Sequence, residues 1–313
     1  CPRPPPPTPT SKAAPPSAAS SWFPEARPAM PFANNDEVRI CWESFGDPSA
    51  PAILLVNGLG SQMTRWPEGF CTLLVDAGYR ALRFDNRDTG LSTWFGEGDA
   101  YTLEDMAADA MAVLDAAGVE AAHVAGVSMG GMISQVIAAD HGRRTLSLTS
   151  IMSTSSAPGL PQASPRVMAV LTQPTPDFTT DPDAHVAAAV ENALVIGSPA
   201  YPWPEGALAE RARAEAERAW NPTGSGRQMR AVGATGDRSA RLARITAPTV
   251  VLHGADDPVL PAERGRDTAA KIPGAELRII EGMGHDLPPA LFGIVADAIL
   301  AAAARAGRPL QGA

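Results

Sequence analysis

Residues 123–135 read HVAGVSMGGMISQ, a strand-like run that turns abruptly and continues as a helix. The residues up to Val127 have the apolar character of a buried strand, and those after Gly130 have helical spacing. Two glycines, Gly126 and Gly130, flank Ser128, and glycine lets backbone segments approach without a Cβ clash. The stretch therefore predicts a tight strand-to-helix turn that presents the Ser128 hydroxyl to a partner at the start of a helix.

Strand-like and helix-like segments alternate on both sides of this turn. Short apolar or alternating runs predict strands at 38–46, 52–56, 79–85, 121–127, 146–153, 249–254 and 275–282. Helical spacing and end signals predict helices at 65–77, 101–118, 130–141, 261–271 and 288–304. This order is typical of an α/β fold with a mostly parallel central sheet and helices on both faces.

One break interrupts the alternation. Residues 156–240 have no strand-like run and are rich in helical segments, of which 183–197 and 205–220 are the clearest. We expect them to form a helical cap inserted into a core made of 29–155 and 241–313. Residues 1–28 contain ten prolines and are predicted to be a disordered leader or tether. A mature bacterial lipoprotein begins with an acylated cysteine, so Cys1 is consistent with a lipid-anchored protein outside the cytoplasm. A trimmed or misassigned start would explain Cys1 equally well, so the sequence leaves the cellular compartment open.

Composition excludes several classes of function. The chain has a formal net charge of −9 and a pI of about 5.1, which argues against nucleic acid or an anionic membrane surface as a partner. No apolar run approaches the ~20 residues of a membrane span. Cys41 and Cys71 lack metal-ligand spacing and are expected to be small core residues. No metal cluster and no dinucleotide fingerprint is present, so we predict no cofactor.

A glycine-flanked serine between strand and helix matches the nucleophile elbow, which needs a base and an acid later in the chain. GMGHD (282–286) follows a predicted strand and supplies His285 as the candidate base. The other four histidines are interpreted as structural. HGADDPVLP (253–261) follows another strand and offers two acids, of which spacing favours Asp257 over Asp256.

Two further features complete the predicted site. Backbone N–H groups that bind an oxyanion should come from Met129, directly after the serine, and from Leu59 in the Gly-rich loop VNGLGSQ at 56–62. Asp286 is interpreted as a loop or cap residue. The motif FDNRDTGLST (84–93) is interpreted as a buried polar network, formed by Asp85, Arg87, Asp88 and Ser92, that holds the loop beside the site.

With these motifs located, the chain resembles the α/β-hydrolase fold family over about 38–304. Within that family it is similar to bacterial esterases of the aclacinomycin methylesterase and proline iminopeptidase-like group, through NGLGSQMTRWPEGFC, RFDNRDTGLST, YTLEDMAADA, GVSMGGMISQ and EGMGHDLPPAL. The resemblance implies Ser128 as nucleophile, Asp257 as acid, His285 as base, and Leu59 and Met129 as oxyanion donors. Asn57 departs from the His or Met of such esterases, and the loop lacks the His-Gly-Gly-Pro-Gly of proline iminopeptidases.

We therefore expect a serine hydrolase that cleaves small or medium carboxylic esters, methyl esters or lactones among them. Tyr201, Trp203 and Trp220 of the cap are candidates for contact with an apolar substrate, and equally for the cap's own core. Three alternatives stay open: an aminopeptidase, a cofactor-free perhydrolase on the same triad, and a non-catalytic ligand receptor of this fold. The sequence does not decide the oligomeric state.

Overall fold

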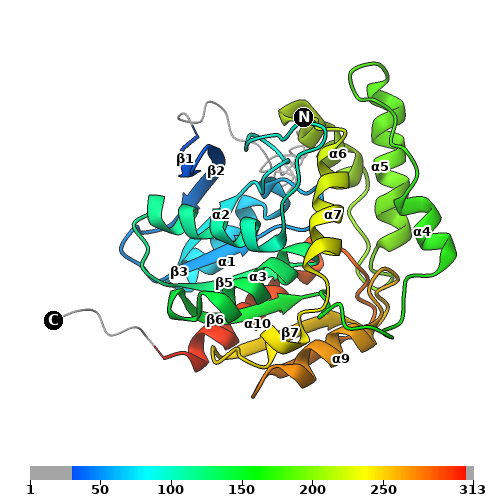
Figure 1. Cartoon of the computed structure of the whole chain (residues 1–313). Helices are drawn as coiled ribbons and strands as arrows, with labels where there is room; N and C mark the ends of the chain where they lie inside the picture. The colour runs from blue at the N-terminus through cyan, green and yellow to red at the C-terminus, as the bar shows by residue number, and fades with distance from the viewer. Residues whose placement is uncertain (1–29, 308–313) are drawn as a thin grey trace, which may run out of the picture.

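The computed structural model describes residues 30–307, and in them eight strands form one sheet with the order β1-β2-β4-β3-β5-β6-β7-β8 (Figure 1). The strands β1, β2 and β4 pair antiparallel, and all later neighbours pair parallel. Their bounds are β1 (Phe32–Asn35), β2 (Val38–Phe45), β3 (Ala52–Val56), β4 (Arg80–Phe84), β5 (Ala122–Val127), β6 (Thr145–Ile151), β7 (Thr249–Gly254) and β8 (Glu276–Ile280). The predicted α/β fold class is confirmed.

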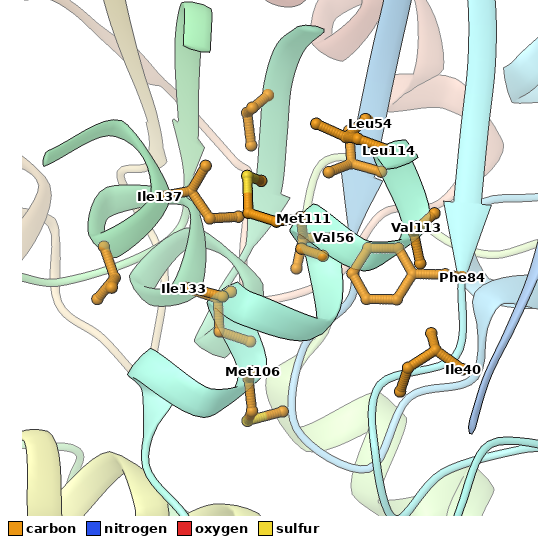
Figure 2. Close-up of a cluster of buried hydrophobic side chains, with 14 of the residues drawn as sticks. Ile40, Leu54, Val56, Phe84, Met106, Met111, Val113, Leu114, Ile133 and Ile137 are labelled. Atoms are coloured by element: carbon orange, nitrogen blue, oxygen red, sulfur yellow. The ribbon is translucent and has the colours of Figure 1, made fainter. Parts of the chain in front are cut away.

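The central strands are apolar throughout because helices cover both of their faces. In β3, Leu54 and Val56 join one hydrophobic cluster, whereas Ile53 and Leu55 join the cluster on the opposite face. This is the two-residue period of a strand with both sides buried. Figure 2 shows the first cluster, where side chains of the sheet such as Phe84 meet side chains of the covering helices.

Helices form a layer on each side of the sheet. One face is covered by α1 (Glu68–Asp76) and α10 (Phe292–Arg305), and the other by α2 (Leu103–Ala116), α3 (Met129–Asp140), α8 (Ser239–Leu242) and α9 (Ala262–Lys271). The start of α2 has the capping box that the sequence indicates: Thr102 and Asp105 each bond the other's backbone N–H. Short 3-10 turns lie at Met63–Arg65, Gly142–Arg144 and Pro289–Leu291.

Four helices between β6 and β7 form a group outside these two layers, and we call them the cap helices (Figure 1). They are α4 (Pro165–Leu171), α5 (Pro182–Ile196), α6 (Ala207–Arg218) and α7 (Gly224–Thr235). Two of them, α5 and α6, match the helical segments predicted from the sequence. The strand β1 and the helices α4, α7 and α8 were not predicted.

Several expectations concern the chain ends and the membrane. The Pro-rich leader 1–28 and Cys1 lie outside the described residues. Among the helices of residues 30–307, none has both the length and the apolar character needed to cross a bilayer.

Cys41 and Cys71 are fully buried and unpaired, as expected for small core residues, and burial raises the pKa of each thiol to about 12.

Candidate active site

Ser128 lies on the tight turn that the sequence predicts. Its φ of 54° and ψ of −119° are strained for a residue with a side chain, and α3 begins at the next residue. A Cβ on Gly130 would lie 2.3 Å from the Val56 carbonyl oxygen, and one on Gly126 would lie 2.2 Å from the Gly130 oxygen. Only glycine fits at either position, because Gly130 is pressed against the end of β3 and Gly126 against the first turn of α3.

The carboxyl ends of the parallel strands bring three distant side chains together at one edge of the sheet. Ser128 follows β5, Asp257 follows β7 and His285 follows β8. The Ser128 Oγ lies 3.0 Å from His285 Nε2, and His285 Nδ1 lies 2.7 Å from Asp257 Oδ2. The three groups are therefore within hydrogen-bond reach in the order hydroxyl, imidazole, carboxylate.

The Asp257 carboxylate is held rigidly and stays ionised. Its second oxygen, Oδ1, accepts hydrogen bonds from the backbone N–H groups of Val259 at 2.9 Å and Leu260 at 2.8 Å. Burial by itself raises the pKa of Asp257, but the adjacent His285 and these hydrogen bonds outweigh burial and lower it below its ordinary value. An ionised carboxylate can only accept, so Nδ1 of His285 carries the proton and Nε2 presents a lone pair to Ser128.

Neither of the competing residues near the acid takes its place. Asp256 is exposed and its carboxylate accepts the Gly282 N–H at 2.9 Å. His253 is buried, its Nε2 lies 2.7 Å from the Leu260 carbonyl oxygen and 3.6 Å from Asp257 Oδ2, and burial lowers its pKa. The structure thus brings Asp257, and not Asp256, to the imidazole.

Two backbone N–H groups beside Ser128 are free to bind an oxyanion. Among residues 30–307, neither the Leu59 nor the Met129 N–H has a hydrogen-bond acceptor. The Gly-rich loop lies directly against the serine, since a Cβ on Gly58 would be 3.4 Å from Ser128 Cβ. At the entrance to this loop, Asn57 is fully buried and donates to the Phe84 carbonyl oxygen at 3.2 Å. The Asn57 amide thus makes one hydrogen bond through Nδ2, and its Oδ1 is buried with no partner among residues 30–307.

The FDNRDTGLST loop is a buried polar network, and it also anchors the cap helices. Arg218 of α6 donates to Asp85 at 2.8 Å, and Arg227 of α7 donates to both oxygens of Asp88 at 2.7 and 2.8 Å. Both carboxylates are fully buried. The contacts with the cap were not predicted, because a local pattern does not indicate which distant arginine neutralises a buried aspartate.

The three aromatic candidates for substrate contact lie in different surroundings. Trp203 donates its indole N–H to Asp286 at 2.7 Å. Tyr201 packs on the core cluster that lies under α1 and α10. Trp220 packs edge-on against His185 with ring centroids 4.3 Å apart. Substrate contact by these residues stays a prediction, and Trp203 is hydrogen-bonded to the loop that carries His285.

Sequence reasoning missed two side chains near this loop. Ser198 donates to Asp286 at 2.5 Å and accepts the Gly284 N–H at 2.9 Å. The guanidinium of Arg211 lies 4.3 Å from the centre of the Trp203 ring, and its Nε is buried with no hydrogen-bond partner among residues 30–307. Burial lowers the pKa of Arg211 to about 10. The two glycines of EGMGHD were the available signal that another segment lies on this loop.

A groove of about 890 Å³ lies within the cap, away from the triad. It is bordered by α4, α5 and α6, with Val167, Val190, Leu194 and Arg213 among its lining residues. None of the predicted site residues lines it. Within the described part of the chain, no three His, Cys, Asp or Glu side chains come together as metal ligands would.

Known proteins resemble this chain in sequence and in fold. Residues 51–288 match the family described as alpha/beta hydrolase fold. This chain belongs to the α/β-hydrolase fold family. Two curated relatives are the rhodomycin D methylesterases DnrP of Streptomyces peucetius, 32% identical, and DauP of Streptomyces sp. strain C5, 33% identical. Each alignment covers 85% of this chain and 95% of the relative.

A solved structure agrees with the same family. A hydrolase from Pseudomonas aeruginosa PA01 is 28% identical and superposes with a TM-score of 0.66. The superposition covers 87% of this chain and 98% of that hydrolase. The resemblance to bacterial esterases, predicted from the motifs, is thereby confirmed for the family and for the methylesterase relatives.

Proposed function

We propose that this α/β-hydrolase cleaves carboxylic esters through an acyl-enzyme on Ser128. That the chain is a carboxylic ester hydrolase follows from its kinship with named methylesterases over most of its length. The finer proposal, a serine nucleophile, rests on one observation above all. The Ser128 Oγ lies 3.0 Å from a nitrogen of His285 whose other nitrogen is bound to a buried, ionised Asp257.

In the first half-reaction, His285 Nε2 takes the proton of the Ser128 hydroxyl as Oγ attacks the ester carbonyl carbon. The carbonyl oxygen becomes an oxyanion, and the free N–H groups of Leu59 and Met129 would stabilise it. Asp257 stabilises the imidazolium and keeps it oriented. When the tetrahedral intermediate collapses, the bond to the alkoxide breaks, and His285 gives its proton to that leaving oxygen.

In the second half-reaction, water replaces the alcohol. His285 takes a proton from the water, whose oxygen attacks the acyl carbon of the Ser128 ester. Collapse of the second tetrahedral intermediate releases the carboxylic acid and returns the proton to Ser128 Oγ. The α3 N-terminus directly after Ser128 supports both steps, because a helix N-terminus favours negative charge.

The substrate class we propose is a small or medium ester, with a methyl ester as the first choice. The support is that two relatives are named methylesterases. A lactone or an aminoacyl amide would use the same triad, so a panel of methyl esters, lactones and aminoacyl amides separates these chemistries.

The decisive experiment compares two serine variants on the same helix-bearing segment. We expect Ser128→Ala to reduce kcat on a p-nitrophenyl ester by at least ~10⁴. Ser134→Ala is the matched control, since the buried Ser134 hydroxyl only bonds back to the Gly130 carbonyl oxygen at 2.7 Å. It should stay within a few-fold of wild type. A fluorophosphonate should add its mass to the wild-type chain and to the control, but not to Ser128→Ala. Undiminished turnover by Ser128→Ala would reject the serine mechanism.

A further inference from the structure

The loop that carries His285, residues 281–286, is held from two sides. On the core side, Asp256 contributes twice: its N–H donates to the Met283 carbonyl oxygen at 3.1 Å, and its carboxylate accepts the Gly282 N–H at 2.9 Å. On the other side lie residues 196–203, which connect α5 to α6 in the cap. The position of the imidazole therefore depends on two separate parts of the fold.

Hydrogen bonds to the cap fix the backbone of Gly284 and His285, from which the imidazole side chain extends. The backbone N–H of His285 donates to the carbonyl oxygen of Ile196 at 2.7 Å, and the N–H of Gly284 donates to the Ser198 hydroxyl at 2.9 Å. Both acceptors belong to the cap and neither belongs to the sheet. The backbone of His285 is thus bonded directly to the segment that leaves α5.

Glycine is required where the two segments touch. A Cβ on Gly284 would lie 2.4 Å from the carbonyl oxygen of Gly197, so no side chain fits there. Gly282 has a φ of +72°, its Cβ would lie 2.2 Å from that of Ala200, and its carbonyl oxygen accepts the Ala200 N–H at 3.1 Å. The two glycines of EGMGHD thus permit the cap segment to lie flat on the loop.

Asp286 closes this contact with a side chain. Its Oδ1 accepts the Ser198 hydroxyl at 2.5 Å and its Oδ2 accepts the Trp203 indole N–H at 2.7 Å. Burial raises the pKa of this carboxyl, and the two donors oppose the rise. Ser198 donates to Asp286 and accepts from Gly284, so one hydroxyl links the residues on both sides of His285.

We propose that Ser198, Trp203 and Asp286 are positioning residues that hold the cap segment between α5 and α6 against the His285 loop. The position of this segment would then set the distance and alignment between His285 and Ser128. This proposal rests on the proposed function, in which His285 moves the proton of Ser128. None of the three residues touches a reacting atom: both carboxylate oxygens of Asp286 are bonded to the cap. Proton transfer requires near-ideal distance and alignment, and a small displacement of a catalytic group costs ten- to a hundredfold in rate.

The test compares Ser198→Ala with a matched control, Thr235→Val. The Thr235 hydroxyl also donates to a carboxylate, Glu104 at 2.7 Å, and accepts a backbone N–H, that of Leu103 at 3.0 Å. Both hydroxyls therefore join the helical insertion to the core, but only Ser198 contacts the His285 loop. We expect kcat on a p-nitrophenyl ester to fall about tenfold or more in Ser198→Ala, with KM changed less than twofold. Thr235→Val should retain kcat within twofold, although both variants lower Tm.

Two additional measurements keep the result interpretable. The rate at which a fluorophosphonate labels Ser128 should fall with kcat in Ser198→Ala, because labelling needs the same proton transfer but no deacylation. If Ser198→Ala does not fold, Trp203→Phe removes only the second donor to Asp286, and the same fall in kcat at constant KM is expected, of smaller size.

The outcomes separate this proposal from the proposed function. Equal kcat values for Ser198→Ala and Thr235→Val, or an unchanged kcat in Trp203→Phe, would overturn the positioning role. If Ser128→Ala is inactive in the same experiments, the serine mechanism still holds. An active Ser128→Ala would instead refute the mechanism itself.

Discussion

Replacing Asp257 by asparagine tests how the triad holds its proton. In the wild-type chain, Oδ1 of Asp257 accepts the Val259 and Leu260 N–H groups at 2.9 and 2.8 Å, and Oδ2 accepts from His285 Nδ1 at 2.7 Å. An asparagine has one oxygen, and the two backbone donors fix where it lies. Its NH₂ group must then face His285, and an NH₂ group can only donate.

The consequence is a change of tautomer at His285. With a donor opposite Nδ1, the neutral ring keeps its lone pair on Nδ1 and its proton on Nε2, so Nε2 cannot accept the proton of Ser128. Turning the amide over would lose two partly buried backbone hydrogen bonds, at up to ~1–3 kcal/mol for each unsatisfied donor. We therefore expect kcat to fall by ~10⁴, the size of loss that this substitution produces in other Ser-His-Asp triads, which corresponds to ~5.5 kcal/mol.

The assay is steady-state hydrolysis of a p-nitrophenyl ester at neutral pH, with Asp256→Asn as the matched control. Asp256 is exposed, and among residues 30–307 its carboxylate accepts only the Gly282 N–H. The amide oxygen of an asparagine can accept the same bond and keep the support of the His285 loop, so this variant should stay within a few-fold of wild type. An Asp257→Asn enzyme that retains more than about one-hundredth of kcat, or an Asp256→Asn enzyme that loses as much, would refute this reasoning about the acid.

Three further predictions concern stability. Arg227→Met should lower the free energy of unfolding by ~3 kcal/mol, because it leaves the buried Asp88 carboxylate without its cation. In urea titrations, the double variant with Asp88→Asn should recover part of this loss, and no recovery would contradict the argument. Gly130→Ala should prevent correct folding, since its Cβ would meet the Val56 oxygen at 2.3 Å, whereas Gly233→Ala on α7, with nothing within 4 Å, should be neutral or stabilise by up to ~1 kcal/mol; circular dichroism melts compare the two. Although burial opposes the shift, hydrogen bonds from Thr235 and Arg241 lower the pKa of Glu104 from its ordinary value of 4.5 to about 2. Because its pKa is lower in the folded state, the ionised Glu104 carboxylate stabilises the fold above pH 4.5, and this contribution is lost as the pH falls toward 2. The difference in Tm between wild type and Glu104→Gln should therefore narrow over this range, and a constant difference would contradict the argument.

The candidate triad could be predicted because its constraints are local. Gly126 and Gly130 report a backbone too tight for side chains, and the acid and histidine loops each follow a short apolar strand. Since parallel strands end at the same edge of a sheet, residues after three such strands meet in space. Fine geometry also decided between neighbours: both Asp256 and Asp257 follow β7, and only the fold shows that Asp257 reaches the imidazole.

Two elements, β1 and α7, escaped prediction for different physical reasons. β1 has four residues and is stabilised by its antiparallel pairing with β2 rather than by its own pattern. The helix α7 contains three glycines, which disfavour a helix by propensity. It is held by Arg227 on Asp88 and by Gln228, which donates to the Arg87 carbonyl oxygen at 2.8 Å.

The sheet with helices on both faces, the tight serine turn and the candidate serine and histidine can be predicted from local patterns, because strand period, helix period and glycine spacing act over a few residues. Which segments pack against the loops that carry Ser128 and His285 is known only from the folded chain. Ser198 and Asp286 are 88 positions apart, and the Ser198 hydroxyl donates to the Asp286 carboxylate. No local pattern encodes such a pair, since its energy is gained only after the whole chain has folded.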